Sequence, residues 1–474
     1  MPLRSANIVG SGPNGLSAAI TLAKRGVAVT VLERNATIGG ACSTAEITLP
    51  GFRHDLGSSI YPLGIASPFF RTLPLKQYGL HWIEPDAPLA HPLDDGTAVT
   101  LEHSLEATAA QFEPHDARAW LLLMGSTIRD WNKLLDDFMR PLLRVPSSPV
   151  AMATFGMAAA LPSETLARSV FRGEPARALF GGCSAHSVVP LSHLASAAIG
   201  LVFSAAANTT GWPIVAGGAQ GLSDALAGYL ESLGGVIETG VDIREAGELP
   251  PADVTLFDTA ADTFERIMSD ELTPSFRTRL RSFQHGPGTF KVDWALSQPI
   301  PWKAKACLRA ATVHVGGTLP EIAWSEFAAF HGLPCERPFV LVTQPSLFDP
   351  SRAPAGKHTA WAYCHVPAGS DVDLTTVIED QMERFAPGFR DCVLARKSSN
   401  STTLGTWNHN LVAGDISGGA MTLPQIIARP TLRAYRTSNP TLYLCSSSTP
   451  PGGGVHGMCG HLAAMAAIKD HGVA

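Results

Sequence analysis

The sequence predicts an α/β protein in which a parallel sheet is interrupted by a second, α+β unit. Residues 6–44 run as an apolar strand, a glycine turn, a helix and a second strand. Apolar runs at 253–257 and 441–445 predict buried strands that return to the same sheet. The stretches between these pieces have other patterns. A chain of 474 residues is long enough for two or three such units.

The first glycine turn has the spacing of a dinucleotide-binding site. Strand Asn7–Val9 leads into Gly10, Gly12 and Gly15, and a helix follows. Gly10 permits the tight turn, Gly12 lets the backbone approach a pyrophosphate, and Gly15 lets the helix pack on the sheet. The second strand ends in Glu33, where an acid can accept hydrogen bonds from ribose hydroxyls. Together these features predict a Rossmann-like nucleotide site.

The residues around Glu33 narrow the choice of dinucleotide. Glu33 would repel a ribose 2′-phosphate, so NADP is disfavoured although Arg34 follows. NAD and FAD remain. Gly39 and Gly40 come next, and two adjacent glycines would let the chain pass close to a ligand lying along the fold. An ordinary loop turn is the alternative interpretation.

A second glycine run near the C-terminus favours FAD. The strand 441–445 is followed by a polar turn, by Gly452-Gly453-Gly454-Val455-His456-Gly457, and by a helix from Met458 to about Lys469. The run is too far from its strand to be a second dinucleotide motif. It would instead present backbone amides and a positive helix end to one ligand. The pyrimidine edge of a reduced flavin carries negative charge and suits such a site.

These motifs, together with Asp55-Leu56-Gly57-Ser58, resemble the FAD-dependent phytoene desaturase and flavin amine oxidase superfamily. The similarity is greatest to the phytoene-dehydrogenase-like branch often named after pyridine nucleotide–disulfide oxidoreductase domain protein 2. The resemblance implies a glutathione-reductase-type FAD-binding domain, an apolar substrate and no second dinucleotide fold for NADPH. Pro450 stands where relatives often have His, and Ala41 where amine oxidases prefer Arg. We therefore do not carry over a carotenoid substrate.

The residues expected to contact FAD come from the glycine motifs, the acidic strand end and three shorter segments. They are Gly10, Gly12, Pro13, Asn14, Gly15, Glu33, Arg34, Gly39, Gly40, Ala41, Cys42, Ser58, Val241, Gly453, Gly454, Val455 and His456. The resemblance implies that the backbone of Val241 lies against the adenine.

The predicted FAD-binding domain is discontinuous, comprising residues 1–66, 212–262 and 411–474. Two insertions, 67–211 and 263–410, would form the substrate-binding and lid domain. The first insertion is expected to be helical, with Trp120, Leu123, Ile128 and Trp131 on a buried face. The second alternates apolar and polar residues at 289–296, 339–343 and 359–365, as antiparallel strands do. We expect a sheet-backed pocket under a helical lid.

Composition excludes several function classes. A net charge of −6 without a basic run argues against nucleic-acid binding. The eight cysteines include no Cys-x-x-Cys pair, and Ile47 occupies the place where a flavin disulfide reductase has its second redox cysteine after Cys42. The first strand starts about six residues from Met1, which leaves no room for a targeting peptide and predicts a cytoplasmic protein.

Two apolar stretches, 150–161 and 194–207, are shorter than the ~20 residues that cross a membrane. They are expected to be core helices or channel walls, with peripheral membrane contact as the alternative. The sequence does not determine the oligomeric state.

Flavin dehydrogenation requires a C–H bond held near the flavin and little else, so no catalytic triad is expected. The weak catalytic candidates are His456, His186 and His409. His456 could tune or covalently hold the flavin, or be a turn residue bonded to backbone, which we favour. The histidines are scattered, so no metal site is predicted.

The predicted function is the FAD-dependent removal of two electrons from a largely apolar organic molecule, by dehydrogenation or desaturation. Oxygen, a quinone or another acceptor would reoxidise the protein. A flavin amine oxidase that releases peroxide, a redox-neutral FAD-dependent isomerase and a non-catalytic FAD-stabilised scaffold are the alternatives.

Overall fold

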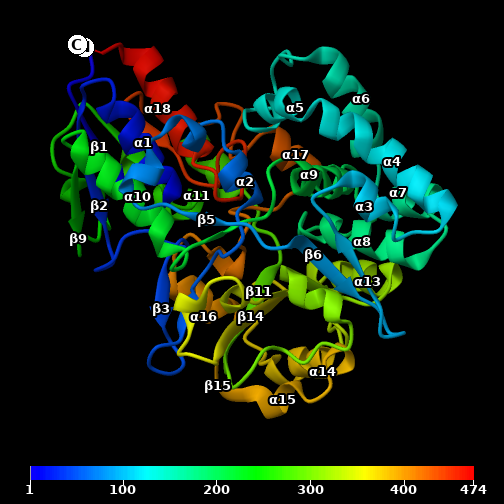
Figure 1. Cartoon of the computed structure of the whole chain (residues 1–474). Coiled ribbons are helices and arrows are strands. Elements are labelled where there is room, and N and C mark those ends of the chain that lie inside the picture. Colours follow the sequence, from blue (N-terminus) through cyan, green and yellow to red (C-terminus); the bar gives the residue numbers. More distant parts are fainter. Residues whose placement is uncertain (1, 474) are drawn as a thin grey trace.

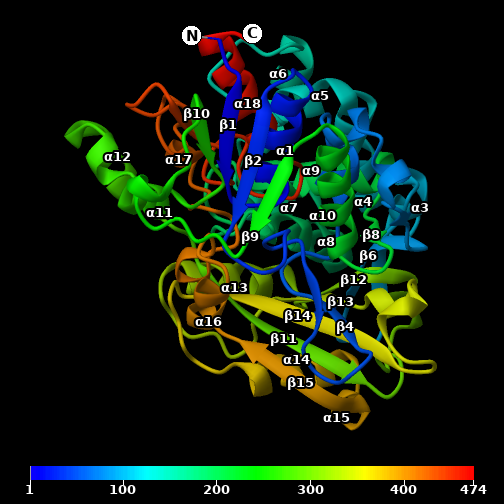
Figure 2. The same cartoon turned by 90° about the vertical axis from the view of Figure 1, so that its left-hand side faces the viewer.

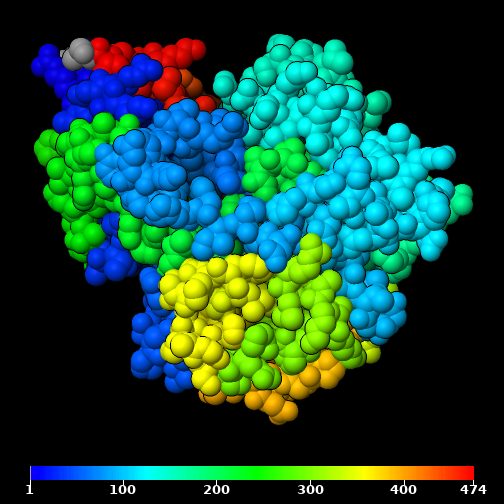
Figure 3. All heavy atoms as spheres, in the orientation of Figure 1, coloured from blue at the N-terminus to red at the C-terminus, as the bar shows by residue number. Residues whose placement is uncertain are grey.

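The computed structural model describes residues 2–473. Three parts are visible in Figures 1 and 3: a parallel-sheet layer with both termini, a helical layer drawn in cyan, and an antiparallel-sheet layer drawn mainly in yellow and orange. The predicted α/β class with a Rossmann-like fold and an antiparallel sheet is confirmed. The division into domain ranges stays a prediction.

The parallel sheet is assembled from pieces far apart in the sequence. Its order is β16-β10-β1-β2-β9, and all four pairings are parallel (Figure 2). The strands are β1 (Ser5–Val9), β2 (Ala28–Glu33), β9 (Val236–Thr239), β10 (Val254–Phe257) and β16 (Leu442–Leu444). Because their carboxyl ends share one edge, the loops that follow β1, β2 and β10 meet there.

Both faces of this sheet are buried, and successive residues along each strand point to opposite faces. Ile8 and Val31 pack under α1 (Pro13–Ala23), α10 (Gln220–Ser232) and α18 (Met458–His471). Val9 and Leu32 face α11 (Ala261–Ile267) and α12 (Pro274–Arg281). These two helices follow β10: α11 crosses the expected boundary at residue 262, and α12 lies beyond it. Residues 241–243 are irregular because the chain turns at Gly240, whose φ is +76°.

The second sheet has the order β15-β11-β14-β13-β12-β6-β7. Its strands are β6 (Ala87–Pro92), β7 (Ala98–Leu101), β11 (Gly288–Leu296), β12 (Ala310–Val315), β13 (Val340–Thr343), β14 (His358–Val366) and β15 (Val393–Ser399). The three predicted strands match β11, β13 and β14. The first insertion also contributes β6 and β7, which the expectation of a helical segment missed. Helix α14 (Thr375–Phe385) packs behind the sheet.

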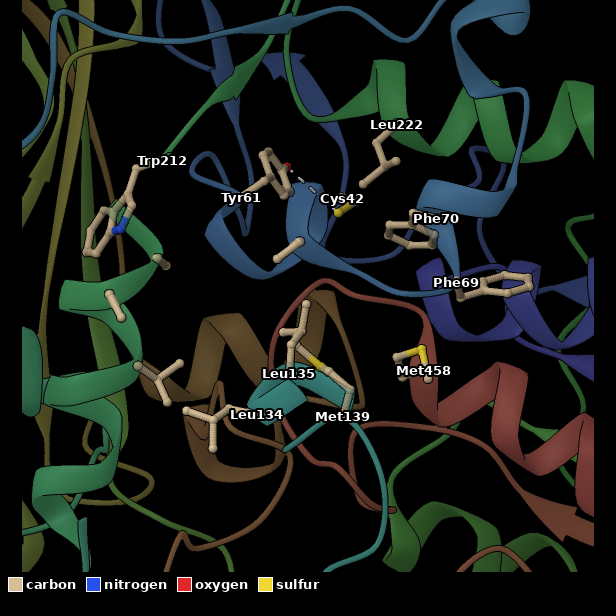
Figure 4. Packing of buried hydrophobic residues seen from close by; sticks show 14 of the residues in the cluster. Cys42, Tyr61, Phe69, Phe70, Leu134, Leu135, Met139, Trp212, Leu222 and Met458 are labelled. Atoms are coloured by element: carbon tan, nitrogen blue, oxygen red, sulfur yellow. Dashed lines mark hydrogen bonds between the residues drawn. The ribbon is translucent and has the colours of Figure 1, made fainter. Parts of the chain in front are cut away.

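Six helices of the first insertion form the helical layer. They are α4 (Pro114–Arg129), α5 (Trp131–Phe138), α6 (Pro149–Ala159), α7 (Ser163–Val170), α8 (Glu174–Ala185) and α9 (Ser196–Thr209). Trp120 and Trp131 are buried as expected, whereas Leu123 and Ile128 are only half-buried. Figure 4 shows Leu134, Leu135 and Met139 near Met458, so α5 packs over the start of α18.

Within residues 2–473, no helix combines the length and the apolar character needed to cross a membrane.

Candidate functional site

Two cavities adjoin between the sheets. The first, of 440 Å³, follows the carboxyl edge of the parallel sheet, and the second, of 200 Å³, lies on the antiparallel sheet. Eight residues line both: Gly57, Ser58, Ile60, His186, Phe203, Tyr363, Leu411 and Ile416. A molecule in the second cavity would therefore meet one end of a ligand in the first.

The glycine turn of the first cavity is built for a close approach to backbone. Gly10 has a φ of +102°, and Gly12 is the N-cap of α1 with both Pro13 and Asn14 beside it on the cavity wall. A Cβ on Gly12 would lie 2.6 Å from Asp258 Oδ2, and one on Gly15 would collide with Gly10 O. The turn thus has no room for larger residues at Gly12 and Gly15, and its backbone lies at the wall of the cavity where a pyrophosphate is expected.

Glu33 ends β2 at the cavity wall, as predicted. Its Oε2 accepts hydrogen bonds from Ser11 N at 2.9 Å and Ser11 Oγ at 2.7 Å, and its Oε1 accepts them from Asn35 N at 2.8 Å and Asn35 Nδ2 at 3.0 Å. These four bonds fix the carboxylate and use its acceptor sites, so a ribose hydroxyl would take the place of a side-chain donor such as Asn35 Nδ2.

Arg34, Val241 and His409 line the same end of the first cavity. Arg34 Nη1 lies 2.6 Å from the exposed His409 ring, and Arg34 Nη2 donates to Trp407 O at 3.1 Å. His409 lines the first cavity beside the acidic strand end, away from the wall shared with the second. This position favours a role near the nucleotide for His409 rather than in chemistry on a substrate.

The two later glycine segments also reach the first cavity. Gly40, Ala41 and Ser58 lie on its wall, as do Gly453, Gly454 and Val455. Gly39 lies behind the wall, where an added Cβ would come within 2.6 Å of both Cys42 O and Ser223 Oγ. Packing against α10 therefore accounts for Gly39.

His456 and Cys42 have buried side chains behind the wall. His456 Nδ1 accepts a hydrogen bond from Met458 N at 3.1 Å, and burial lowers the pKa of His456 to about 4. This is the turn role favoured above, and the geometry gives no support to covalent attachment through His456. Cys42 Sγ lies 3.1 Å from Ser58 Oγ beside Tyr61, and burial raises its thiol pKa to about 11 (Figure 4).

Asp258 is a site residue that the sequence analysis missed. It directly follows β10, so its position at the shared carboxyl edge was the available signal. Its buried Oδ2 accepts a hydrogen bond from Gly15 N at 2.8 Å, and Asp258 lines the first cavity beside Gly12. Burial, with a contribution from Glu33, raises the pKa of Asp258 to about 7.

This pKa predicts that FAD binding weakens as the pH rises. Below pH 7 Asp258 is largely neutral, whereas above it a carboxylate would repel the pyrophosphate held by the same turn. We expect the Kd for FAD to increase about tenfold between pH 6 and pH 8.5, which corresponds to a rise of about one unit in the pKa of Asp258 when FAD binds. Flavin fluorescence titrations of wild type and Asp258→Asn at several pH values measure this Kd. A wild-type Kd that does not change with pH, or an equal slope in the variant, would contradict this role.

The second cavity has a polar floor and apolar sides. Thr289, Thr312 and Thr343 point into it from β11, β12 and β13, and their Oγ1 atoms have no hydrogen-bond partner among the described residues. Buried hydroxyls of this kind leave donors and acceptors for a ligand. The sides are apolar or aromatic and include Phe203, Trp212, Leu341, Trp361, Leu404 and Ile416.

Lys291 is a second missed residue on this floor. Its Nζ donates to both carboxylate oxygens of Asp293 at 2.5 Å and lies 4.5 Å from the centroid of the Trp361 ring. The alternating pattern of β11 places Lys291 and Asp293 on one face of the strand. That face is buried, because the other residues around the cavity and the strand β4 (Arg53–Asp55) cover it.

His186 stands where the two cavities meet. Its Nε2 lies 3.0 Å from Nε2 of His314, and burial lowers the pKa of His186 to about 3. Of the three catalytic candidates, His186 alone lines both cavities.

Comparisons with known proteins agree with this geometry. The profile of the NAD(P)-binding Rossmann-like domain matches residues 8–73. The pyridine nucleotide-disulfide oxidoreductase domain-containing protein 2 of Mus musculus is 28% identical over 550 residues, spanning 99% of this chain and 94% of the mouse protein. Phytoene desaturase from Neurospora crassa is 53% identical over 57 residues, 12% of this chain and 9% of that protein. The chain is thus similar over nearly its whole length to pyridine nucleotide-disulfide oxidoreductase domain-containing protein 2, and over a short stretch to a phytoene desaturase.

A structure of putrescine oxidase shares the fold, with a TM-score of 0.63 at 17% identity and 98% coverage of each chain. The protein is an FAD-dependent oxidoreductase, and its cofactor is FAD. The residues present fit that cofactor: the crowded glycine turn, the fixed Glu33 and the closing Gly453-Gly454 segment lie along one continuous cavity.

Proposed function

We propose that the protein oxidises a small, largely apolar molecule by dehydrogenation or desaturation, removing two electrons. The observation that carries this proposal is the second cavity, which shares a wall with the FAD cavity and is mostly apolar apart from its floor. Bound FAD supplies the acceptor for a hydride. The apolar sides exclude water and hold the substrate, and the threonine hydroxyls position one polar group of it.

The size of the second cavity limits the substrate. A volume of 200 Å³ is below the ~300 Å³ at which pockets for drug-sized ligands begin. A substrate of about ten carbon atoms with one hydroxyl or carbonyl group fits this description better than a long polyene. His186 is the side chain we propose as the base, because it is the imidazole at the junction.

The test is anaerobic bleaching of the FAD absorbance by a panel of monoterpenes, monoterpene alcohols, medium-chain alcohols and primary amines. We expect an oxygenated apolar compound to bleach the wild type. A Thr312→Val variant should retain FAD but require a higher concentration of that compound for the same bleaching. Bleaching by amines alone, with peroxide formed in air, would establish the amine oxidase alternative. Isomerisation without bleaching would establish the isomerase, and no response to any compound would contradict the proposed substrate class.

We also propose peripheral contact with a membrane through the α5–α6 region. Leu143, Val145, Val150 and Met157 have exposed fractions of 61%, 83%, 81% and 73%. Three exposed cations lie in the same part of the chain: Arg140 after α5, and Arg129 and Lys133, which both pair with Asp130. Exposed apolar residues beside cations are typical of helices that bind anionic lipid surfaces.

The double substitution Val145→Asp and Val150→Asp is expected to weaken binding to anionic phospholipid vesicles about tenfold or more. The reason is that burying each valine side chain in the membrane contributes roughly 1.5 kcal/mol of binding free energy. Vesicle flotation measures it. Val372→Asp, at a 57% exposed valine of the antiparallel-sheet layer, is the control. Equal flotation of the double variant and wild type would contradict this contact.

A further inference from the structure

Three histidines, of which His314 and His91 are fully buried and His186 is half-buried, run from the cavity junction toward the surface. His186 on the cavity wall contacts His314 of β12, and the His314 ring lies edge-on to the His91 ring of β6 with centroids 6.5 Å apart. His91 Nε2 is 2.7 Å from Gly317 O. Beyond His91 lies Glu321, a partly exposed carboxylate paired with Arg384 at 3.0 Å.

The hydrogen bonds assign a tautomer to each ring. A carbonyl oxygen only accepts, so His91 carries its proton on Nε2 and its Nδ1 is an acceptor. His186 Nε2 has His314 Nε2 as partner, which leaves His186 Nδ1 for the cavity. If His186 donates in this pair, His314 carries its own proton on Nδ1.

Gly182 lies between the second and third histidines, His314 and His91. The Nδ1 atoms of His314 and His91 are both buried and lack partners among residues 2–473. Both adjoin Gly182 of α8, where an added Cβ would lie 2.6 Å from His314 Nδ1 and 3.4 Å from His91 Nδ1. A donor on His314 and an acceptor on His91 thus face the same space, and glycine keeps it open.

We propose that His186, His314 and His91 form a proton relay that carries the substrate's proton from the cavity to the surface beside Glu321. The proposal rests on the proposed oxidation. In that reaction a hydride leaves the substrate with both electrons to FAD, and a proton leaves the neighbouring atom to form an N–H bond at His186 Nδ1. His186 Nε2 passes its proton to His314 Nε2. His314 Nδ1 passes its proton to His91 Nδ1 through a water molecule in the space beside Gly182, because the two nitrogens are not within hydrogen-bond distance of each other. The imidazolium at His91 then releases its Nε2 proton past Gly317 O to the partly exposed Glu321, and the three rings return to their starting tautomers before the next turnover.

The environment of the three imidazoles favours their neutral form, so a proton is passed on and does not stay on one ring. Burial lowers the pKa of His186 to about 3 and that of His91 to about 4, with Glu321 acting in the opposite direction on His91. His365, which is 2.8 Å from Glu326, also faces His186 and disfavours a resting charge there. His186 is the catalytic residue of this set, and His314 and His91 act through it.

Gly182→Ala and His314→Phe test the relay, with Gly181→Ala as the matched control. Gly181 is the neighbouring residue of α8, and its added Cβ would lie 2.6 Å from Leu319 Cδ1, far from the imidazoles. With a substrate found in the bleaching panel, we expect both relay variants to reduce FAD about 10- to 100-fold more slowly. Their solvent deuterium isotope effect should differ from that of wild type. Gly181→Ala should keep both the rate and the isotope effect.

A second measurement does not depend on turnover. In FAD-loaded protein labelled with ¹⁵N-histidine, NMR should show His91 and His186 protonated on Nε2 and His314 on Nδ1, with Gly182→Ala changing the His314 signals. Relay variants with wild-type rates and isotope effects, or His314 protonated on Nε2, would overturn the proposal. If no compound bleaches the wild type while the tautomers are as expected, the proposed function is wrong, and the arrangement of the three histidines is still confirmed.

Discussion

Replacing Gly12 by alanine is expected to abolish tight FAD binding while leaving the fold intact. Gly12 has a φ of −64°, which alanine adopts without strain, so the effect is confined to the space around the residue. The new Cβ would approach Asp258 Oδ2 to 2.6 Å and intrude where the pyrophosphate must meet the helix amides. Loss of two charge-assisted hydrogen bonds of about 2 kcal/mol each would weaken binding about 10³-fold.

The measurement is the Kd of the refolded apoprotein for FAD, with circular dichroism to verify the fold. Gly125→Ala in α4 is the control, because an added Cβ there meets nothing within 4 Å. A Gly12→Ala protein that is purified with a full complement of FAD would show that the pyrophosphate lies elsewhere.

The second large effect concerns the buried ion pair of Lys291 and Asp293. Removing one member of a buried pair costs about 3–5 kcal/mol, because the other is left charged and desolvated. The two members differ, however. Burial already raises the pKa of Asp293, so this carboxyl can take up a proton when its partner is lost. Lys291 is 4% exposed beside Trp361, and in Asp293→Asn its ammonium group would lose its buried counter-charge.

We therefore expect Asp293→Asn to destabilise the protein by about 3–5 kcal/mol and Lys291→Met by less. Urea denaturation of the FAD-loaded protein, followed by fluorescence, measures both free energies. The double variant should be more stable than Asp293→Asn alone, because it contains no uncompensated lysine. If the two single variants lose equal stability, protonation of Asp293 does not compensate for the loss of Lys291.

Short-range spacing was sufficient to predict the cofactor half of the site. Gly10, Gly12, Gly15 and Glu33 lie within one β-α-β unit, where strand, turn and helix are set by neighbours in the sequence. The closing glycine segment was predicted for a similar reason, since its strand, glycines and helix are contiguous. Cys42 and Gly39 were assigned by proximity to these motifs, and only packing showed that they lie behind the cavity wall.

The substrate half depends on contacts between distant segments. Thr289, Thr312 and Thr343 come from three strands and become neighbours only when the second sheet forms. Lys291 and Asp293 follow an alternating pattern, and they are buried only because β4 and the other residues around the cavity cover their face of the sheet. Sequence periodicity reports which residues share a face and does not report what covers that face.

The sequence by itself determined that this protein holds a dinucleotide at the edge of a parallel sheet, because glycine spacing and strand order act locally along the chain. The tertiary structure alone decided what lies opposite that dinucleotide. His186, His314 and His91 stand on α8's C-terminal end and on two strands of the other sheet, and their alignment results from packing of α8 against that sheet. No local pattern encodes it, since the residues that meet there are separated by about a hundred positions or more.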